Sequence, residues 1–551
     1  MKLFRYLILS ALVLPALEGC HVPLKPYRLA HPAIELPVVP PAAPITPIGF
    51  AGQKKDCVSA STPICLAFIE VDDMGELFDK GEVDTALAVI RRANDHAKSL
   101  PPQSAPIVIT FVHGWKNNAA PANANVEGFI AALQQIYQKN PARQVIGIYV
   151  GWRGDLIRSY FPISRQFSYY NREATAIRVP GATLSTALAR IAARTHENDH
   201  GLVVFIGHSF GGLLLERTVS ESTASQIAQE TIFAQEAQEA AESSKNSTDA
   251  NAKQIADQLV RDSTKATKFA SNSRADLVIF INPAGAATEA KQMLDFLTYN
   301  GYRYQPGLSS DPGSSDQPAA ALDNDADRPL IVSLSSTADL ATKVALPIGH
   351  SLPYLGFKNA GSFRNLAPVT PDPHSPEALT QEEKDRGKYS LQCFDPHNTQ
   401  HAYWNWDTKA EGAQAQGSYY LSSTPHMQVL QSHLMLKAVG ASQMKVSSTG
   451  ELIAIKDPNA IATCDRDLFN RQGLNVVSTF RLRDTQTCFA VQERPNRCNG
   501  TPYWVMEIDP DVVPDHSTIF TQRFIWFLID TFFSTEGRPM VRSTPQLIKT
   551  H

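Results

Sequence analysis

Short continuous runs of apolar residues, rich in Val, Ile and Phe, recur along the chain, and most are followed by a turn and then by helix-like sequence. They occupy residues 64–71, 106–112, 144–150, 202–206, 276–282, 329–334 and, near the end, 503–508. Runs of this length without polar alternation are typical of strands buried on both faces of a parallel sheet. Because they alternate with helical sequence, the pattern predicts an α/β fold with a mainly parallel central sheet flanked by helices.

Three stretches interrupt this alternation. Residues 216–274 are rich in Ala, Gln, Glu, Ser and Lys, which predicts an inserted helical segment with a flexible piece at 243–248. Residues 305–327 are rich in Pro, Ser, Gly and Asp and are typical of a loop. Residues 351–499 are too many for a simple connection. We interpret them as a cap or lid inserted between the last two strands of the core.

The N-terminus combines basic residues, an apolar run and a cysteine. Lys2 and Arg5 precede the apolar run 6–17, which is the pattern of a secretory signal peptide. The run is too short for a transmembrane helix, which needs about 20 residues. The segment that ends in Cys20 resembles the lipobox of bacterial lipoproteins, although Glu18 stands where small residues are usual. The resemblance implies lipidation of Cys20; an ordinary signal peptide with an incidental cysteine is the alternative.

Six further cysteines follow: Cys57, Cys65, Cys393, Cys464, Cys488 and Cys498. An even number in an exported chain favours disulfides, up to three of them here. Cys57 with Cys65, and two of the late group with each other, are the local pairs, but the sequence does not choose among all the pairings. No spacing matches a structural zinc site.

Composition and charge narrow the class of partner. The chain has 551 residues, of which 43% are hydrophobic and 19% charged, as in globular proteins. Its 50 basic and 54 acidic side chains leave a net charge of −4. Nucleic-acid binding draws on clustered Lys and Arg, so this balance gives no reason to expect it. A small-molecule or lipidic partner is favoured instead.

A serine motif follows one of the buried runs. The run 202–206 leads directly into Gly207-His208-Ser209-Phe210-Gly211, and an apolar helical start comes next. This is the G-x-S-x-G pattern in a strand–turn–helix context. Side chains at Gly207 and Gly211 would collide in so tight a turn, which holds Ser209 on a sharp bend. A serine needs a base and an acid to become a nucleophile. The alternative is an inert serine in a small-residue turn.

In this context the sequence resembles the α/β-hydrolase superfamily of esterases and lipases, over about 64–349 and 500–533. The resemblance implies an oxyanion loop after an earlier strand, and the run 106–112 ends in His113-Gly114-Trp115. Gly114 would let the chain turn close to the substrate. The backbone N–H groups of Trp115 and Phe210 would then bind the developing oxyanion. His113 precedes the serine and is expected to be structural.

The catalytic residues of this superfamily occur in the order serine, acid, histidine. Asp339 lies just after the run 329–334, which makes it the candidate acid; its alternative role is that of a helix N-cap. His516 follows the run 503–508 and is the candidate base. Competing histidines are His350, His397, His401 and His426.

Ser209, Asp339 and His516, with two backbone donors, would transfer an acyl group to water through an acyl-enzyme. The resemblance favours carboxylic esters, including lipids, as substrates. A peptidase, thioesterase or acyltransferase would use the same groups, and a non-catalytic surface lipoprotein would use only the scaffold. Aromatic residues of the insert, Tyr403, Trp404 and Trp406, would line an acyl pocket or form the core of the cap. No motif for a metal, phosphate or dinucleotide competes, so no cofactor is expected.

These interpretations divide the chain as follows: signal peptide 1–20, proline-rich tether 21–60, hydrolase core 61–350, cap 351–499, and 500–551 with the last strand, the histidine loop and the final helix. We expect an exported protein, anchored to a bacterial membrane at the periplasm or cell surface. A freely periplasmic or secreted protein is the alternative. The oligomeric state is not specified.

Overall fold

The computed structural model describes residues 25–28, 33–38, 56–155, 169–285, 290, 293, 330–342, 435–440, 463–464, 466–471, 476–481, 488–493, 503–529 and 532. The architecture is α/β, with a mostly parallel sheet flanked by helices, as the apolar runs predicted. The chain forms two compact units. The first comprises Met1–Gly201 and Ile206–Thr218, and the second comprises Leu202–Phe205 and Val219–His551. Strand β5 (Leu202–His208) and helix α7 (Phe210–Asn246) contribute residues to both units.

The first unit contains four strands in the order β1-β2-β4-β3 among its described residues. These are β1 (Ile34–Glu35), β2 (Ile64–Glu70), β4 (Val145–Gly151) and β3 (Ile107–Val112). β4 pairs in parallel with both β2 and β3, whereas β1 runs antiparallel to β2. Every residue of β2, β3 and β4 is buried, which explains why their sequences are continuously apolar.

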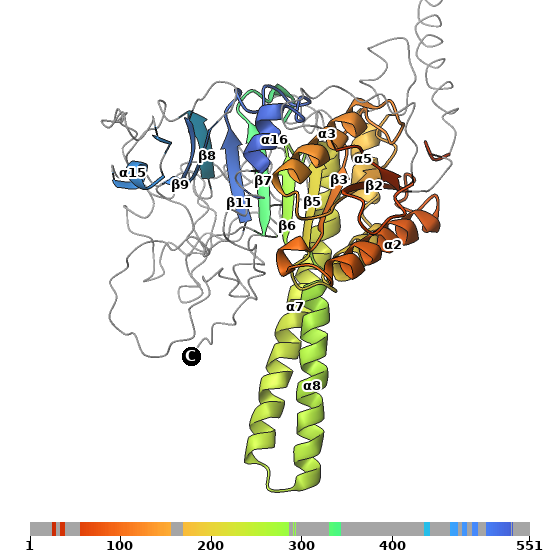
Figure 1. Cartoon of the computed structure of the whole chain (residues 1–551), viewed down its shortest axis with the longest axis vertical. Helices are drawn as coiled ribbons and strands as arrows, with labels where there is room; N and C mark the ends of the chain where they lie inside the picture. The colour runs from red at the N-terminus through yellow and green to blue at the C-terminus, as the bar shows by residue number, and fades with distance from the viewer. Residues whose placement is uncertain are drawn as a thin grey trace, which may run out of the picture. The chain divides into compact units, whose positions relative to one another are not determined.

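Helices accompany these strands, as Figure 1 shows. They are α2 (Lys80–Ala97), α3 (Ala124–Lys139), α5 (Tyr169–Arg178) and α6 (Ala182–Thr195), with the short 3-10 turn η2 (Pro102–Ser104) before β3. α2 begins at the N-cap Asp79, whose carboxylate accepts a hydrogen bond from the backbone N–H of Gly81. α3 begins in the same way at Asn123. Such caps satisfy backbone N–H groups that the first helical turn leaves without partners.

The N-terminal residues Tyr27 and Arg28 are attached to the first unit. Their backbone N–H groups donate to the buried carboxylate of Glu70, at 2.8 and 2.9 Å. The guanidinium of Arg28 lies 3.3 Å from the ring centroid of Phe68, and its Nε donates to the carbonyl of Ala119 at 2.8 Å. Burial lowers the pKa of Arg28 to about 10, against the opposing effect of Glu70. Part of the proline-rich stretch 21–60 therefore lies against the core.

The second unit contains strands in the order β6-β7-β11-β8-β10-β9. They are β6 (Leu277–Ile281), β7 (Ile331–Ser336), β11 (Tyr503–Ile508), β8 (Met435–Gly440), β10 (Cys488–Glu493) and β9 (Val476–Arg481). β6, β7, β11 and β8 are parallel neighbours, and β10 runs antiparallel to both β8 and β9. The short helices α15 (Arg466–Arg471) and α16 (Gln522–Leu528) belong to the same unit. The described part of 351–499 thus adds strands to this sheet.

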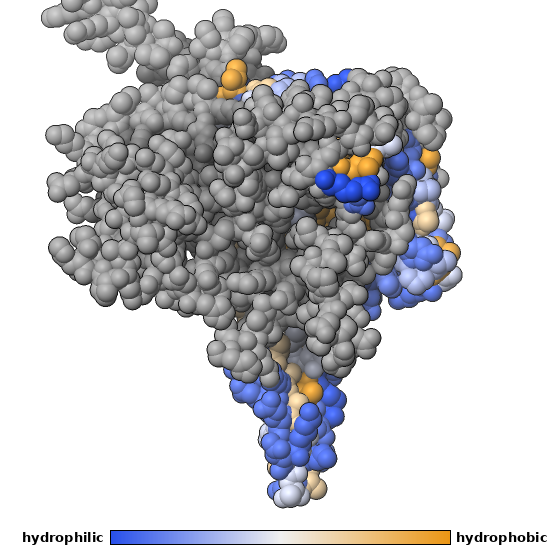
Figure 2. All heavy atoms as spheres, turned by 90° about the vertical axis from the view of Figure 1, so that its left-hand side faces the viewer, coloured by the Kyte–Doolittle hydropathy of each residue, from blue (hydrophilic) through white to orange (hydrophobic). Residues whose placement is uncertain are grey.

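Helices α7 and α8 (Ala250–Asn272) lie side by side as a hairpin (Figure 1). The break between them, 247–249, overlaps only the end of the predicted flexible piece 243–248, because 243–246 belong to α7. Buried Ala256, Ser263 and Ala270 recur every seven residues along α8, which is typical of two helices in close contact. The visible surface of the hairpin is mostly hydrophilic, with a few apolar side chains among the polar ones (Figure 2).

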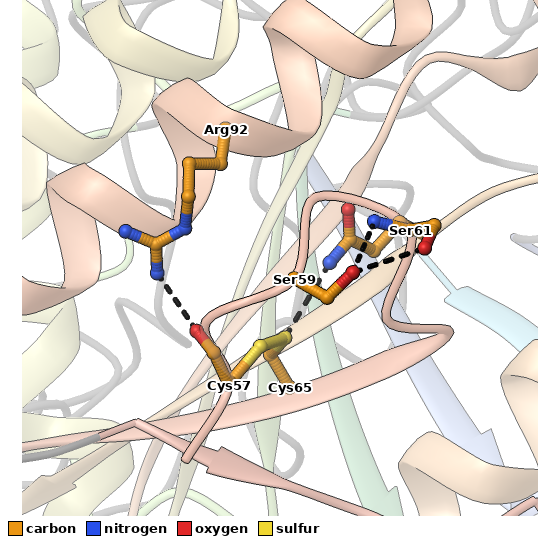
Figure 3. The surroundings of a disulfide bond; sticks show 6 residues. Cys57, Ser59, Ser61, Cys65 and Arg92 are labelled. Carbon is orange, nitrogen blue, oxygen red and sulfur yellow. Dashed lines mark hydrogen bonds between the residues drawn. A yellow bond between two sulfur atoms is a disulfide. The ribbon is translucent and has the colours of Figure 1, made fainter.

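Two disulfides lie in the described residues, Cys57–Cys65 and Cys464–Cys488. Both agree with the local pairs expected from the sequence; Cys20, Cys393 and Cys498 lie outside the described residues. Figure 3 shows the first disulfide beside α2, where the Arg92 guanidinium donates to the carbonyl of Cys57 at 2.8 Å. Disulfides are typical of proteins in oxidising compartments.

Among the helices of the described residues, none has the length and apolar character needed to span a membrane.

Candidate active site

Ser209 occupies the sharp turn between β5 and α7. Its φ of +56° lies in the left-handed region, which residues other than glycine rarely adopt. The serine carbonyl accepts the hydrogen bond from Leu213 N–H at 3.1 Å, so the helix begins directly at the turn. Backbone strain of this kind persists only where the surroundings hold it in place, and it often marks functional sites.

The glycines on either side of Ser209 explain how the turn is held. A Cβ at Gly211 would lie 2.3 Å from the carbonyl oxygen of His113 and 2.4 Å from that of Val112. A Cβ at Gly207 would lie 2.7 Å from the carbonyl oxygen of Gly211. Any side chain at either position would collide with backbone, as expected from the sequence. The turn therefore packs directly on the end of β3.

The loop after β3 lies against the same turn. A Cβ at Gly114 would come within 2.9 Å of both Ser209 Cβ and His208 Nδ1. Next to it, the rings of Trp115 and Phe210 have centroids 6.2 Å apart. The structure thus brings together the predicted serine, oxyanion-loop glycine and both candidate oxyanion residues within the first unit.

His113 holds this loop and is fully buried. Its Nε2 accepts the backbone N–H of Trp152 at 3.1 Å, so the ring proton lies on Nδ1, which donates to the carbonyl of Gly114 at 2.9 Å. Burial lowers the pKa of His113 to about 4, and the ring is neutral at physiological pH. In a planar trans peptide the N–H points opposite to the C=O. Fixing the Gly114 carbonyl therefore also fixes the direction of the Trp115 N–H.

Two further residues support the loop and were missed by sequence reasoning. Trp152 stacks on His113 with 5.8 Å between ring centroids, and its Nε1 donates to the carbonyl of His113 at 2.7 Å. Gly154 accepts the backbone N–H of Lys116 at 3.0 Å, and a Cβ at Gly154 would lie 2.9 Å from the carbonyl of Gly114. The only sequence signal for either is its place directly after the buried strand β4.

Asp339 and His516 form a pair in the second unit, 177 residues apart in sequence. Oδ2 of Asp339 lies 2.9 Å from Nδ1 of His516, and the aspartate is fully buried. Asp339 also accepts the backbone N–H groups of Ala341 and Thr342 at 2.9 and 3.1 Å, and the Thr342 hydroxyl at 2.5 Å. It is therefore a helix N-cap and a partner of histidine at once.

The charge of Asp339 determines the tautomer of His516. Burial alone would raise the pKa of Asp339, but the hydrogen bonds and charge of His516 and the hydrogen bonds of Thr342 hold that pKa below its ordinary value. The ionised carboxylate of Asp339 can accept hydrogen bonds but cannot donate them. Nδ1 of a neutral His516 therefore carries the proton, and Nε2 carries the lone pair. This is the orientation that a general base requires. Adjacent Asp515 points elsewhere, because it accepts from Ser517 N–H and Thr518 N–H at 2.7 and 2.8 Å.

Other predicted residues lie outside the described part of the chain. They are Cys20, His350, His397, His401, Tyr403, Trp404, Trp406 and His426. Among the described residues no group of three or more His, Cys, Asp or Glu side chains is arranged to hold a metal ion.

No family model, curated protein or solved structure matches this chain. The functional argument therefore rests on geometry.

Proposed function

We propose that the chain is a serine hydrolase of the α/β-hydrolase type that cleaves carboxylic esters through an acyl-enzyme. The observation that carries the proposal is the turn at Ser209, where a serine with φ of +56° packs against Gly114 and the end of β3. The pair of buried Asp339 with His516 supports it, because a histidine with its proton on Nδ1 is what such a serine needs as a base.

In the proposed reaction the Ser209 hydroxyl attacks the acyl carbon while His516 Nε2 takes its proton. The histidine then gives that proton to the leaving alcohol, and water releases the acyl group by the same steps. Asp339 stabilises the positive charge that forms on His516. The N–H groups of Trp115 and Phe210 hold the oxyanion, each worth about 3–4 kcal/mol of transition-state stabilisation. The proposal requires Ser209 of the first unit to meet His516 of the second.

The wider proposal covers the organisation and location of the chain. It assigns 61–350 and 500–551 to a hydrolase core and 351–499 to a cap; within 351–499, strands β8, β9 and β10 extend the sheet of the second unit, and most other residues lie outside the described part of the chain. It assigns 1–20 to a signal peptide with Cys20 as a lipid anchor, and thus places the protein outside the cytoplasm. The two disulfides support export.

A fluorophosphonate probe tests the proposed nucleophile, because it labels only activated serines. We expect wild type to be labelled, Ser209→Ala to be unlabelled, and His516→Asn to react about 10⁴- to 10⁶-fold more slowly. Ser59→Ala, an exposed serine in the loop after Cys57, is the matched control and should label like wild type. Unlabelled wild type, or equal labelling of Ser209→Ala, would exclude the enzyme and leave the non-catalytic lipoprotein.

The substrate class is tested with p-nitrophenyl esters of increasing chain length, beside thioester and peptide substrates. We expect ester hydrolysis that depends on Ser209. Faster turnover of thioesters or peptides would favour the thioesterase or peptidase alternative. A preference for short soluble esters would argue against lipids as substrates.

Mass analysis of the mature N-terminus tests lipidation of Cys20, and an unmodified cysteine would exclude the lipid anchor.

A further inference from the structure

Asn282 is a buried polar residue directly after β6, at the same edge of the second unit as the Asp339–His516 pair. Its side chain is fully buried, and its φ is +44°. Asparagine tolerates this left-handed conformation better than most residues. Its own backbone N–H donates to the carbonyl of Leu334 at 2.7 Å, which continues the pairing of β6 with β7.

The Asn282 carboxamide joins the two loops that carry the pair. Its Oδ1 accepts the backbone N–H of Ser336 at 2.9 Å, at the end of β7. Its Nδ2 donates to the carbonyl of His516 at 3.1 Å and to that of Asp515 at 3.3 Å. One side chain thus contacts the strand that precedes Asp339 and the backbone of His516 itself.

Ser336 continues this connection on the aspartate side. Its carbonyl accepts the backbone N–H of Asp339 at 3.2 Å. Its hydroxyl donates to the carbonyl of Val513 at 2.5 Å, in the histidine loop, and accepts the N–H of Ala338 at 3.1 Å. Asn282 and Ser336 therefore tie the two loops together at two separate points.

A carboxamide matches the hydrogen-bond partners around Asn282 better than a carboxylate does. The site needs an acceptor facing an N–H and a donor facing two carbonyls, and an amide supplies both within one planar group. A carboxylate of the same shape would still accept from Ser336, but it would face the carbonyls of Asp515 and His516 with an oxygen. The carbonyls would then be repelled rather than held.

We propose that Asn282 is the positioning residue of the pair, which holds the His516 backbone so that Nδ1 meets Asp339 Oδ2. It touches no reacting atom and acts through His516. The kinetic consequence rests on the proposed serine-hydrolase function, whereas the consequence for the geometry of the pair does not. A small displacement of a catalytic group can cost about 100-fold in rate.

The test compares Asn282→Asp with a matched control in the first unit. Asn94 is also buried, and its Nδ2 donates to the consecutive carbonyls of Arg194 and Thr195, at 2.7 and 3.4 Å. Asn94→Asp therefore removes the same kind of bond far from the pair in sequence. Asn282→Gly is a second variant, because glycine adopts positive φ freely and removes only the carboxamide.

The first readout is the proton NMR signal of His516 Nδ1–H in full-length protein labelled with ¹⁵N-histidine. A histidine paired with a buried carboxylate gives a strongly downfield signal, which His516→Asn and Asp339→Asn assign. We expect this signal in wild type, Ser209→Ala and Asn94→Asp, and its loss or broadening in both Asn282 variants. An unchanged signal in a folded Asn282 variant would overturn the proposal, whether or not the protein is an enzyme.

The second readout is ester hydrolysis. We expect kcat to fall about 10- to 100-fold in the Asn282 variants with KM nearly unchanged, and to stay within about 2-fold of wild type in Asn94→Asp. Equal losses in the Asn282 and Asn94 variants would mean a merely structural role. If wild type proves inactive, the proposed function fails, and the NMR signal still decides whether Asn282 positions the pair.

Discussion

At the scale of single residues, the candidate site uses side chains whose hydrogen bonds leave little choice of orientation. Asp339 holds His516 and caps its own helix, two roles that are alternatives in the sequence and coexist in the structure. His113 is held between Trp152 N–H and the carbonyl of Gly114. In both cases a buried group with a shifted pKa exists in one protonation state, so its partners determine where the proton lies.

His113 provides a prediction at this scale. Replacement by alanine removes the donor to the Gly114 carbonyl, so the Trp115 N–H loses its fixed direction. We expect kcat to fall about 10- to 100-fold, because one oxyanion donor would be misaligned. KM should change little.

Steady-state ester kinetics measure this effect, with His196→Ala as the control for removing a buried imidazole from the same unit. An unchanged kcat in His113→Ala, with the variant folded, would show that the Gly114 peptide needs no support from the ring.

At the scale of elements, strands with continuous apolar sequences were predictable and strands with mixed sequences were not. β2, β3 and β4 are buried along their whole length, which produces continuous apolar runs. β8, β9 and β10 have mixed apolar and polar sequences such as Met435–Gly440. Short strands of this kind depend on pairing with neighbours rather than on their own sequence. β8 pairs with β11, which comes more than sixty residues later.

Helix α2 provides a prediction at this scale. Glu82 lies in its first turn, and its carboxylate accepts the backbone N–H of Glu70 at 2.6 Å. Burial, with some repulsion from Glu70 and Asp79, raises the pKa of Glu82 to about 8. The folded state therefore binds this proton more tightly than the unfolded state, and stability falls as the pH rises from about 4.5 to about 8.

Glu82→Gln removes this titration while it keeps an acceptor for Glu70 N–H. We expect the Tm of wild type, relative to that of Glu82→Gln, to decrease steadily between about pH 5 and pH 8. Glu127→Gln, in the first turn of α3, is the control and should track wild type. Parallel Tm curves for wild type and Glu82→Gln would contradict the raised pKa.

At the scale of the whole molecule, segments far apart in sequence supply the hydrogen-bond partners of each other's polar groups. The backbone of Tyr27 and Arg28 supplies the N–H donors of Glu70, and β1 pairs with β2 as an edge strand. Proline content alone predicted an extended tether in 21–60. That prediction missed these contacts because the pattern contains no information about the buried carboxylate that binds the chain.

Arg28 provides a prediction at this scale. Arg28→Ala removes the stack on Phe68, the bond to Ala119 and the positive charge near Glu70. We expect the free energy of unfolding to fall by about 2–4 kcal/mol, because a buried carboxylate would lose its compensating charge. Urea unfolding measures the change. Arg91 is an exposed arginine on α2, and Arg91→Ala is the control. An equally small loss of unfolding free energy in both variants would show that Arg28 does not anchor the N-terminal residues to the core.

The sequence by itself determined the strands with continuous apolar sequences, the glycine-flanked turn at Ser209, and the candidates Asp339 and His516. These depend on local constraints: continuous burial, a turn without room for Cβ atoms, and the position of a residue after a strand. Tertiary structure alone decided that Asp339 meets His516, that Asn282 joins their loops, and that His113 orients the Gly114 peptide. Each of these is a hydrogen bond made by at least one buried group. Leaving such a group without a partner is costly, but the sequence does not show which residue the partner is.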